Sequence, residues 1–388
     1  MAEKVDYAAL KKGGFMRQKQ KGCFSLRLAV VGGNLTAENI KTVAEVAEKY
    51  GHGYVHMTSR QGIEIPFIKV EDINEVKEEL AKGGVGTGVC GPRVRTITAC
   101  QGAAICPSGC IDTYTLAKEL DARYFGRELP HKFKFGVTGC QNNCLKAEEN
   151  DVGIKGGMTV ECNHDDCIQC GVCLKACREG ALRMEDGKIV IDREKCNNCA
   201  RCVKSCPTDA WVGEPGYIVS FGGLFGNKIY KGEQIVPIIR DKETLFRVTD
   251  AAISFFEKYA NAGERFRLTL ERIGKEEFQK RGSGCLRRQI GVLTNKMSIR
   301  IEKERKSMAE IQFDDQVDIT DKVCPLTFVK AKVAIEELDD GEILAIRMND
   351  GEPVQNVPRS MKEEGHKILK LEDNADGTYT LYVRKVEE

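Results

Sequence analysis

The N-terminal part of the chain alternates between two hydrophobic periods. Between residues 23 and 31, apolar and polar side chains alternate, which predicts a strand. After Thr36, a plausible N-cap, apolar residues recur every three or four positions, which predicts a helix. Strands at 54–57 and 63–67 and a second helix over 73–83 follow. This β-α-β-β-α order is typical of a ferredoxin-like half-domain, a packed unit of the α+β class.

The same two periods predict the remaining elements. Residues 217–240 alternate in the manner of strands, and residues 251–259 and 266–278 have the helical period, so they should close a second, α/β domain. Residues 283–309 are basic and polar with little periodicity, which predicts a linker. The last segment predicts a two-layer α/β domain, with helices over 329–341 and near 357–364 and strands at 343–348 and 379–383.

Composition places the chain among globular proteins and excludes several classes. It has 388 residues, 41% of them hydrophobic and 30% charged, enough for two to four domains. No apolar run approaches the roughly 18 residues of a membrane span, and the N-terminus lacks the apolar segment of a secretory signal. Eighteen cysteines in such a chain indicate reduced thiols on metal rather than disulfides. We therefore expect a cytoplasmic protein from an organism that avoids oxygen.

The charge is distributed unevenly along the chain. Residues 310–388 contain 19 acidic and 10 basic residues, a net charge of −9, which leaves +10 for residues 1–309. A basic body can bind nucleic acid, but no helix-turn-helix, RNP or zinc-finger pattern is present. Binding of small anions explains the bias equally well, so we expect no nucleic-acid partner.

Two cysteine pairs enclose a basic segment in the first half of the chain. A Cys-x5-Cys pair begins at Cys100 and a Cys-x3-Cys pair begins at Cys140. Four thiolates can hold an iron–sulfur cluster, whereas zinc sites favour pairs two to four residues apart. The spacing therefore favours iron–sulfur, although Cys90 and Cys110 lie close by and leave the ligand set open from spacing alone.

These pairs and four basic residues resemble the sulfite and nitrite reductases that carry siroheme coupled to a [4Fe–4S] cluster. That family has an arginine in a Thr-x-Arg-Gln segment, a second arginine five residues before the first cysteine, and two lysines in Pro-x-Lys-x-Lys. The matching positions here are Arg60, Arg95, Lys132 and Lys134. The resemblance implies that the coupled cluster is ligated by Cys100, Cys106, Cys140 and Cys144, with Cys144 bridging to the siroheme iron.

The four basic residues suit the chemistry that the resemblance implies. Siroheme carries eight carboxylates, and sulfite and nitrite are anions, so both require fixed cations. Arginine offers a planar fork to an oxyanion, and lysine supplies compact charge and protons. In isolation, Arg60 would be a solvated turn arginine, and Lys132 and Lys134 one solvated face of a strand. The family match, which continues at 151–157 and covers roughly residues 15–281, favours the site.

Two further cysteine runs have the signature of a bacterial two-cluster ferredoxin. Each is Cys-x2-Cys-x2-Cys-x3-Cys, and in that signature the fourth cysteine of each run ligates the cluster of the other. The expected ligands are Cys167, Cys170, Cys173 and Cys206 for one [4Fe–4S] cluster and Cys196, Cys199, Cys202 and Cys177 for the second. Arg178 stands where the signature usually has proline, and zinc is a weak alternative. The chain would thus hold siroheme and three [4Fe–4S] clusters, with the insert relaying electrons.

The C-terminal domain resembles the TusA/SirA family of small sulfur carriers, in which a Cys-Pro motif opens a helix. The motif here begins at Cys324, with Thr327 where the family often has a second proline. A cysteine at a helix N-terminus has a lowered pKa, which makes it a better persulfide carrier. An inert buried cysteine is the alternative, and the match beyond Cys324 favours the carrier.

The sequence therefore predicts a siroheme-dependent sulfite reductase built from five segments. They are a ferredoxin-like half-domain at 1–84, a siroheme reductase domain at 85–160 and 211–282, an inserted ferredoxin at 161–210, the linker at 283–309 and the TusA-like domain at 310–388. A nitrite reductase of the same architecture is one alternative. A non-catalytic electron-transfer or sulfur-relay protein without siroheme is the other.

The sequence also predicts two kinds of partner, an electron donor and a second protein chain. No dinucleotide fingerprint is present, so reduced ferredoxin or a separate flavoprotein subunit should donate the electrons. Larger members of the resembled family contain two copies of the half-domain unit, and this chain contains one. We therefore expect a homodimer or pairing with a sister subunit.

Overall fold

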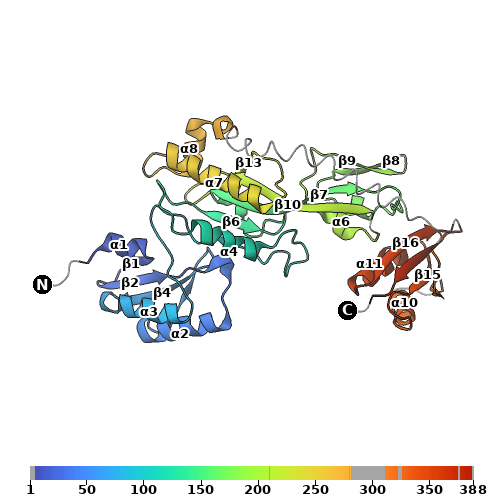
Figure 1. Cartoon of the computed structure of the whole chain (residues 1–388), viewed down its shortest axis with the longest axis horizontal. Coiled ribbons are helices and arrows are strands. Elements are labelled where there is room, and N and C mark those ends of the chain that lie inside the picture. Colours follow the sequence, from blue (N-terminus) through green and yellow to red (C-terminus); the bar gives the residue numbers. More distant parts are fainter. Residues whose placement is uncertain are drawn as a thin grey trace. The chain divides into compact units, whose positions relative to one another are not determined.

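The computed structural model describes residues 5–208, 210–278, 280, 311–321, 326–374 and 376–386. The described parts of 1–157 and 215–290 form one compact unit, and those of 158–214 and 291–388 form a second (Figure 1). The predicted linker at 283–309 and Cys324 lie outside the described residues. Within the described part of the chain, no helix has the length and apolar character that crossing a membrane requires.

The first domain is a four-stranded antiparallel sheet with two helices on one face (Figure 1). Its strands are ordered β1 (Phe15–Arg17), β2 (Cys23–Arg27), β4 (Ile63–Lys69) and β3 (His56–Met57), and its helices are α1 (Tyr7–Lys12), α2 (Ala37–Tyr50) and α3 (Ile73–Lys82). The predicted β-α-β-β-α order is confirmed. Thr36 caps α2, because its hydroxyl accepts the N–H of Asn39 at 3.1 Å.

Two strands of this domain are shorter than predicted. The strand expected over 23–31 ends at Arg27, and the chain enters a 3-10 turn, η1 (Val31–Gly33), in which Gly32 has φ +60°. The strand expected over 54–57 is only β3, because Gly53, at φ +78°, still belongs to the turn after α2. A second 3-10 turn, η2 (Val70–Asp72), leads from β4 into α3.

The second domain of this unit is built on a five-stranded sheet. The strand order is β13 (Glu233–Gln234), β10 (Trp211–Phe221), β7 (Val152–Cys162), β6 (Phe135–Thr138) and β5 (Thr98–Ala99). Strands β5, β6 and β7 are parallel. Helices α4 (Thr113–Tyr124), α7 (Lys242–Tyr259) and α8 (Phe266–Ile273) contribute to one apolar core with this sheet. The 3-10 turn η3 (Ala147–Glu149) and a hairpin of β11 (Leu224–Phe225) and β12 (Ile229–Tyr230) complete the domain.

Aromatic rings hold the segment before β6 in this core. Phe133 is fully buried, and its ring centroid lies 5.2 Å from that of Phe266 and 5.5 Å from that of Phe256. Lys132 and Lys134 on either side of it are half-buried, so exposure alternates along this segment, although it lies before β6 and not in a strand. Burial of Phe133 therefore fixes where both lysines emerge.

The helices of this domain differ in extent from their predictions. Helix α7 begins at Lys242 rather than near residue 251, because the Asp241 carboxylate caps it by accepting the N–H of Thr244 at 2.7 Å. The helix predicted over 266–278 is interrupted, because Gly274, at φ +98°, ends α8 at Ile273 before residues 275–278 become helical again. The hydrophobic pattern did not predict α4.

The insert is a small domain with a hairpin and two very short helices. Strand β7 leads into it and β10 leads back. Its elements are α5 (Val172–Ala176), the hairpin of β8 (Leu182–Glu185) and β9 (Lys188–Ile191), and α6 (Arg201–Ser205). Its core is small and sulfur-rich, since Cys173 and Cys202 are buried together with Trp211. Such a core buries little apolar surface for its size, a situation in which bound metal often supplies stability.

The C-terminal domain has the predicted two-layer α/β architecture. Its sheet has the order β14 (Asp315–Asp318), β15 (Ile343–Asn349), β17 (Thr378–Arg384) and β16 (Lys367–Asp373), and α10 (Leu326–Glu336) and α11 (Glu352–Glu363) pack on it. The pattern predicted β15, β17 and both helices but missed β14 and β16. Helix α11 begins earlier than expected, before residue 357.

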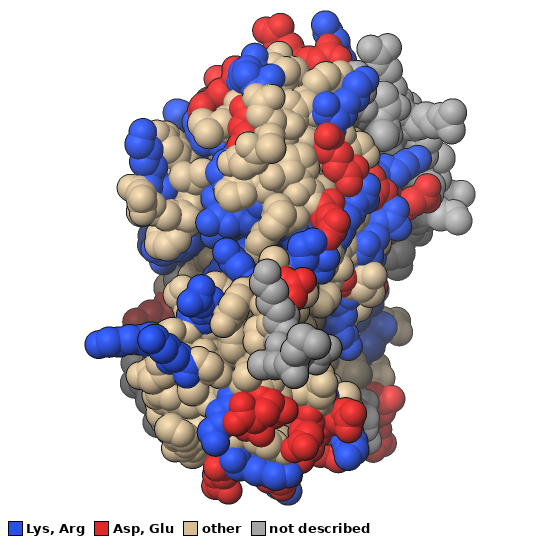
Figure 2. Space-filling view, turned by 90° about the vertical axis from the view of Figure 1, so that its left-hand side faces the viewer, with Lys and Arg blue, Asp and Glu red and all other residues tan. Residues whose placement is uncertain are grey.

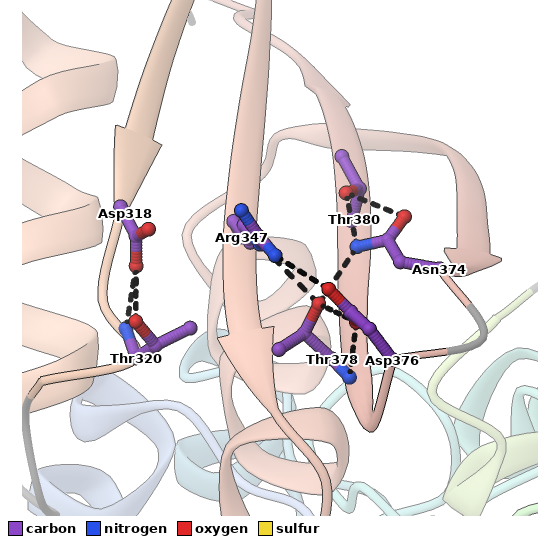
Figure 3. Close-up of polar contacts among 7 residues, drawn as sticks. All are labelled: Asp318, Thr320, Arg347, Asn374, Asp376, Thr378 and Thr380. Carbon is purple, nitrogen blue, oxygen red and sulfur yellow. Dashed lines mark hydrogen bonds and ion pairs between the residues drawn. The ribbon is translucent and has the colours of Figure 1, made fainter.

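An exposed polar network closes the hairpin between β16 and β17 (Figure 3). Asp376 accepts a hydrogen bond from Arg347 Nη2 at 2.6 Å, and the Asn374 side chain donates to the hydroxyls of Thr378 and Thr380 at 3.0 Å each. About half of the Arg347 and Asp376 side chains is exposed, so this ion pair contributes at most about 1 kcal/mol to stability.

Candidate active site

Three parallel strands bring residues of distant segments to one edge of a sheet. Because β5, β6 and β7 point the same way, residues that precede them gather at their amino ends. Arg95 precedes β5, Lys132 and Lys134 precede β6, and Asp151 precedes β7. Arg60 and Arg265 reach the same edge from other segments. We refer to these six residues as the cation site.

Arg60 reaches this edge from the turn between β3 and β4. Its Nη1 donates to Asn150 Oδ1 at 2.9 Å, and its Nη2 donates to the carbonyl of Thr96 at 3.2 Å. The amide of Asn150 is itself buried and donates to the carbonyl of Ala147 at 3.2 Å. Arg60 is therefore tied to the segments that enter β5 and β7, rather than solvated in its turn.

Arg95 is anchored by backbone oxygens. Its two Nη groups donate to the carbonyls of Val89 at 2.7 Å and Gly91 at 3.1 Å. Its Nε is buried and has no hydrogen-bond partner within the described residues. One edge of the guanidinium is thus fixed, and a donor on the other edge is unpaired.

A buried carboxylate organises the centre of the cation site. The Asp151 side chain is completely buried, and its Oδ2 accepts the backbone N–H of Lys134 at 2.9 Å. Arg265 Nη2 donates to both oxygens of Asp151, at 3.0 and 3.1 Å. Burial raises the pKa of Asp151, and Arg265 and the N–H of Lys134 oppose that shift. Asp151 therefore joins the segment before β6 to the start of α8.

The cations are close enough to weaken one another's proton affinity. Burial, then Arg60 and Arg265, lower the pKa of Lys134 to about 8. Burial is also the main cause that lowers the pKa of Arg60 to about 10, and Arg95 and Arg265 add to it. The pKa values of Lys132 and His131 are lowered too, by burial and by Arg265. Positive charges held together at a free-energy cost are what an anion site requires.

One face of the molecule carries mixed charge. Figure 2 shows on it Lys and Arg side chains interspersed with Asp and Glu side chains, so this face is not uniformly basic.

The four cysteines of the first two pairs lie at the other end of the same strands. Cys100 follows β5 and Cys140 follows shortly after β6. The N–H of Gly139 donates to Cys100 Sγ at 3.1 Å, as backbone amides do to cluster thiolates. Burial raises the pKa of Cys140, and the thiols of Cys106, Cys100 and Cys144 raise it further, so the four side chains share one neighbourhood. We refer to these four cysteines as the cysteine site.

Glycines allow the loops of the cysteine site to pack backbone against backbone. A Cβ on Gly109 would lie 2.4 Å from the backbone N of Ala103, and a Cβ on Gly139 would lie 2.9 Å from the Cα of Gly102. A Cβ on Gly156 of β7 would overlap the carbonyl oxygen of Gly139. This close approach leaves no room for a side chain at any of these three positions.

The loop after Cys140 is held by a chain of polar contacts. Asn143, in the left-handed region at φ +51°, accepts the N–H of Ala147 at 2.8 Å and donates to Glu148 at 3.3 Å. Glu148 forms an ion pair with the buried Lys155 of β7. These contacts set the backbone on either side of Cys144, which is exposed.

The cation site and the cysteine site of one chain are separated by the length of the strands. Lys134 directly precedes β6, and Cys140 lies just beyond its end. The four residues of β6 alone span about 13 Å at roughly 3.3 Å per residue. The two sites therefore stand at opposite ends of β5 and β6.

In the insert, two cavities sort the eight cysteines into two sets. One cavity, of about 290 Å³ including the part open to solvent, is lined by Cys167, Cys170, Cys173 and Cys206. The other, of about 360 Å³, is lined by Cys177, Cys196, Cys199 and Cys202. Each cavity thus combines three cysteines of one run with the last cysteine of the other, as the ferredoxin signature predicts.

The two runs also repeat the same backbone conformation. Gln169 and Asn198, each two residues after the first cysteine of a run, have φ of +57° and +58°. Gly171 and Ala200, two residues further on, have φ of +71° and +62° and precede α5 and α6. Among the described residues, no three cysteine, histidine or acidic side chains converge tightly enough to hold a single metal ion. The argument for clusters therefore rests on the shared cavities and on this repetition.

Several functional candidates were not predicted from the sequence. Arg265 and Asn150 carry no motif signal, and Asp151 begins the matched segment 151–157 but had no role assigned to it; their tertiary contacts identify all three. Of the cysteines without a predicted role, Cys90 is buried and accepts an N–H of Arg27 at 3.2 Å, and the N–H of Cys110 donates to Gly139 at 2.7 Å. Cys23 and Cys162 are half-buried, and Cys285 lies outside the described residues.

Known proteins resemble this chain in sequence and in fold. The chain is 32% identical over 281 residues to the coenzyme F420-dependent sulfite reductase of Methanocaldococcus jannaschii, which covers 71% of this chain and 45% of that protein. It is 34% identical over 236 residues to a subunit of the anaerobic sulfite reductase of Salmonella typhimurium, covering 56% of this chain and 69% of the relative. The chain thus spans less than half of the first relative's length. The crystal structure of dissimilatory sulfite reductase I superposes with a TM-score of 0.57 at 20% identity, over 67% of this chain and 69% of that one, which shows a common fold.

Family models account for most of the described chain. The nitrite/sulfite reductase ferredoxin-like half-domain matches residues 16–83, and the sulfurtransferase TusA family matches residues 315–385. The nitrite and sulfite reductase 4Fe-4S domain matches residues 90–283, half of the chain, across the strands that carry the cation site and the cysteine site. The chain therefore belongs to the nitrite and sulfite reductase family, with a C-terminal TusA domain.

Proposed function

We propose that the protein is a siroheme-dependent sulfite reductase. The observation that carries this proposal is the cation site, where Arg60, Arg95, Lys132 and Lys134 converge from three segments and lower one another's pKa values. Arginine forks and lysine ammonium groups are suited to a small oxyanion such as sulfite. Two of the relatives are sulfite reductases by name, which favours sulfite over nitrite.

The residues present fit the cofactors of the family. Cys100, Cys106, Cys140 and Cys144 share one glycine-packed neighbourhood, and a backbone N–H already donates to one of their thiols. They would ligate a [4Fe–4S] cluster, with Cys144, the exposed one, bridging to siroheme. Siroheme, when bound, supplies the iron at which the substrate is reduced.

The cations would bind the substrate and deliver protons. Arg60 and Arg95 each have one edge fixed by protein oxygens, so they present a rigid charge to the oxyanion. Lys134, whose pKa is about 8, can give up a proton near neutral pH more readily than an ordinary lysine. Reduction of sulfite to sulfide takes up six electrons and several protons, so binding and proton delivery are needed at the same place.

The insert would supply the electrons. Its two four-cysteine cavities would each hold one [4Fe–4S] cluster, which with the coupled cluster makes three. The electron donor would be reduced ferredoxin or a separate flavoprotein subunit. In the C-terminal domain, Cys324 would accept or deliver sulfur, as in the sulfur carriers that this domain resembles.

We further propose that the working unit is a homodimer. The cations and the cysteines of one chain stand at opposite ends of β5 and β6, so a substrate bound at the cysteine end is distant from the cations of the same chain. A second copy related by twofold symmetry can bring its cation site to that cysteine site, which completes two equivalent active sites.

A visible spectrum and an iron count of the anaerobically purified protein test the function. We expect siroheme bands that shift when sulfite is added, about 13 iron atoms per chain, and faster turnover with sulfite than with nitrite. Faster turnover with nitrite would assign the chain to nitrite reduction. Iron–sulfur absorption alone, after siroheme has been supplied during expression, would leave an electron-transfer or sulfur-relay protein and reject the catalytic proposal.

Co-expression of two inactive variants tests the dimer. A Cys144→Ala chain and a Lys134→Ala chain, carrying different tags, would form a heterodimer in which one shared site has both defects and the other has none. We expect that heterodimer to recover roughly half of the wild-type activity, with each variant homodimer inactive. No recovery in a purified heterodimer would place the complete site within one chain.

A further inference from the structure

Arg265 lies at the cation site although no motif points to it. It stands at the N-cap of α8, 131 positions after Lys134 in the chain, and only 11% of its side chain is exposed. The segment that precedes α8 packs beside the two lysines, because the N–H of Gly263 donates to the carbonyl of Pro130 at 3.2 Å. The guanidinium is thus a fixed part of this edge of the sheet.

Asp151 places Arg265 directly beside Lys134. Asp151 Oδ2 accepts the backbone N–H of Lys134 at 2.9 Å and Arg265 Nη2 at 3.1 Å, so the two residues share one oxygen atom. Arg265 Nη2 also lies 3.0 Å from Oδ1 of the same carboxylate. Because Asp151 has no exposure to solvent, this arrangement is held without competition from water.

Arg265 repeats the way in which Arg95 is held. Arg95 is anchored through its Nη groups by two carbonyls, and Arg265 is anchored through Nη2 by a carboxylate. In both residues the Nε is buried and has no hydrogen-bond partner within the described residues. A buried N–H without a partner is costly, and an anionic oxygen is the partner that offsets this cost best.

We propose that Arg265 is a fifth cation of the substrate site, one that contacts the bound oxyanion, and that Asp151 is the residue that positions it. This rests on the proposed function, since the anion is the substrate of that site. The Asp151 carboxylate accepts hydrogen bonds from the Arg265 guanidinium and from the backbone N–H of Lys134, so it sets the spacing of the two cations. The ligand is a small oxyanion, sulfite or nitrite.

The lower pKa values of the neighbouring groups agree with this placement. Arg265 contributes to the lowered pKa of Arg60, Arg95, His131, Lys132 and Lys134. A central cation of this kind adds to the attraction of an anion from every side of the site.

Spectral titration of the holoenzyme with sulfite and with nitrite tests the proposal. The variants are Arg265→Lys, which keeps the charge but loses the fork, and Arg265→Gln combined with Asp151→Asn, which removes both charges together. Arg272→Gln is the control on the same helix, because Arg272 forms its ion pair, at 2.7 Å, with Glu264, which is not a residue of the cation site. The double variant avoids leaving Asp151 buried without a counter-charge.

We expect the dissociation constants of both anions to rise roughly 10- to 100-fold in the double variant and by a smaller factor in Arg265→Lys, in line with a lost charged hydrogen bond. The control should stay within about twofold of wild type, and all variants should keep wild-type siroheme and iron content. KM should rise with the dissociation constant, since the lost contact is to the bound substrate.

Two outcomes would overturn the proposal. Unchanged dissociation constants in both variants would make the Asp151–Arg265 pair purely structural. Loss of siroheme from both variants, but not from the control, would show that Arg265 holds a carboxylate of the tetrapyrrole instead. If the wild-type protein binds both anions but reduces neither, the proposed activity fails, while this titration still decides the role of Arg265.

Discussion

The two ends of the strands β5 and β6 are built on opposite principles. At the amino ends, long-range hydrogen bonds join residues of four segments, and the positive charges gathered there repel one another. At the carboxyl ends, the backbones of the loops pack directly against one another. Glycines allow this, because a single added methyl group would overlap the neighbouring backbone. The first end can therefore be altered one charge at a time, whereas the second has almost no tolerance for added volume.

The largest effect that this contrast predicts is at the cysteine end. Replacing Cys140 with Ser should remove the coupled cluster and reduce sulfite reduction more than about 1,000-fold, because a ligand is lost rather than weakened. Iron content should fall by about four atoms per chain, and the clusters of the insert should remain. Cys23→Ser is the control, since Cys23 lies on β2, away from both sites. Full iron content in Cys140→Ser would exclude Cys140 as a ligand.

An intermediate effect, on stability, is expected when a single methyl group is added to a glycine of the cysteine end. In Gly109→Ala the new Cβ would lie 2.4 Å from the N of Ala103, so the loops must shift, at a cost of about 1–3 kcal/mol in the free energy of unfolding. Gly226→Ala is the matched control, because no atom lies within 4 Å of its Cβ. Thermal unfolding of the two variants measures the difference. Equal stabilities would show that the loops can separate, and would remove the contrast between the two ends.

The smallest effect is a pH dependence at the cation end. Burial and neighbouring arginines hold the pKa of Lys134 at about 8, so its charge is present below that pH and is lost as the pH rises through it. Nitrite, which stays fully ionised in this range, should therefore bind several-fold more weakly at about pH 9.5 than at about pH 7. Lys134→Arg should lose most of this pH dependence, because an arginine at that position holds its proton to a higher pH than the lysine. If that variant keeps the wild-type pH dependence, the dependence arises from a titratable group other than Lys134.

The same pKa has a consequence for stability. A lysine whose folded pKa of about 8 lies below the ordinary value of 10.5 binds its proton more tightly in the unfolded chain. The anion-free protein should therefore gain stability as the pH rises from about 8 to 10.5, and denaturant unfolding across that range measures the gain. Added anion should reduce this dependence, because it favours the charged lysine in the folded state.

The sequence by itself determined the elements and the motifs that are local. Alternation and helical periodicity located α2, α3, β4 and β15, and the cysteine runs identified the insert and the partners that share each of its cavities. Such features depend on spacing within about 40 residues, so they can be found from the order of residues alone. Where the sequence erred, at the start of α7 or the end of α8, a cap or a single glycine decided the boundary.

Only the tertiary structure decided how these parts meet. Arg265 and Asp151 join the cation site because α8 packs beside the entry to β6, a contact between residues more than 110 positions apart. The separation of cations from cysteines likewise results from the parallel direction of β5, β6 and β7, which places the residues before each strand at one edge of the sheet and the residues after it at the other. Neither fact has a local signal, because each arises from packing between distant segments.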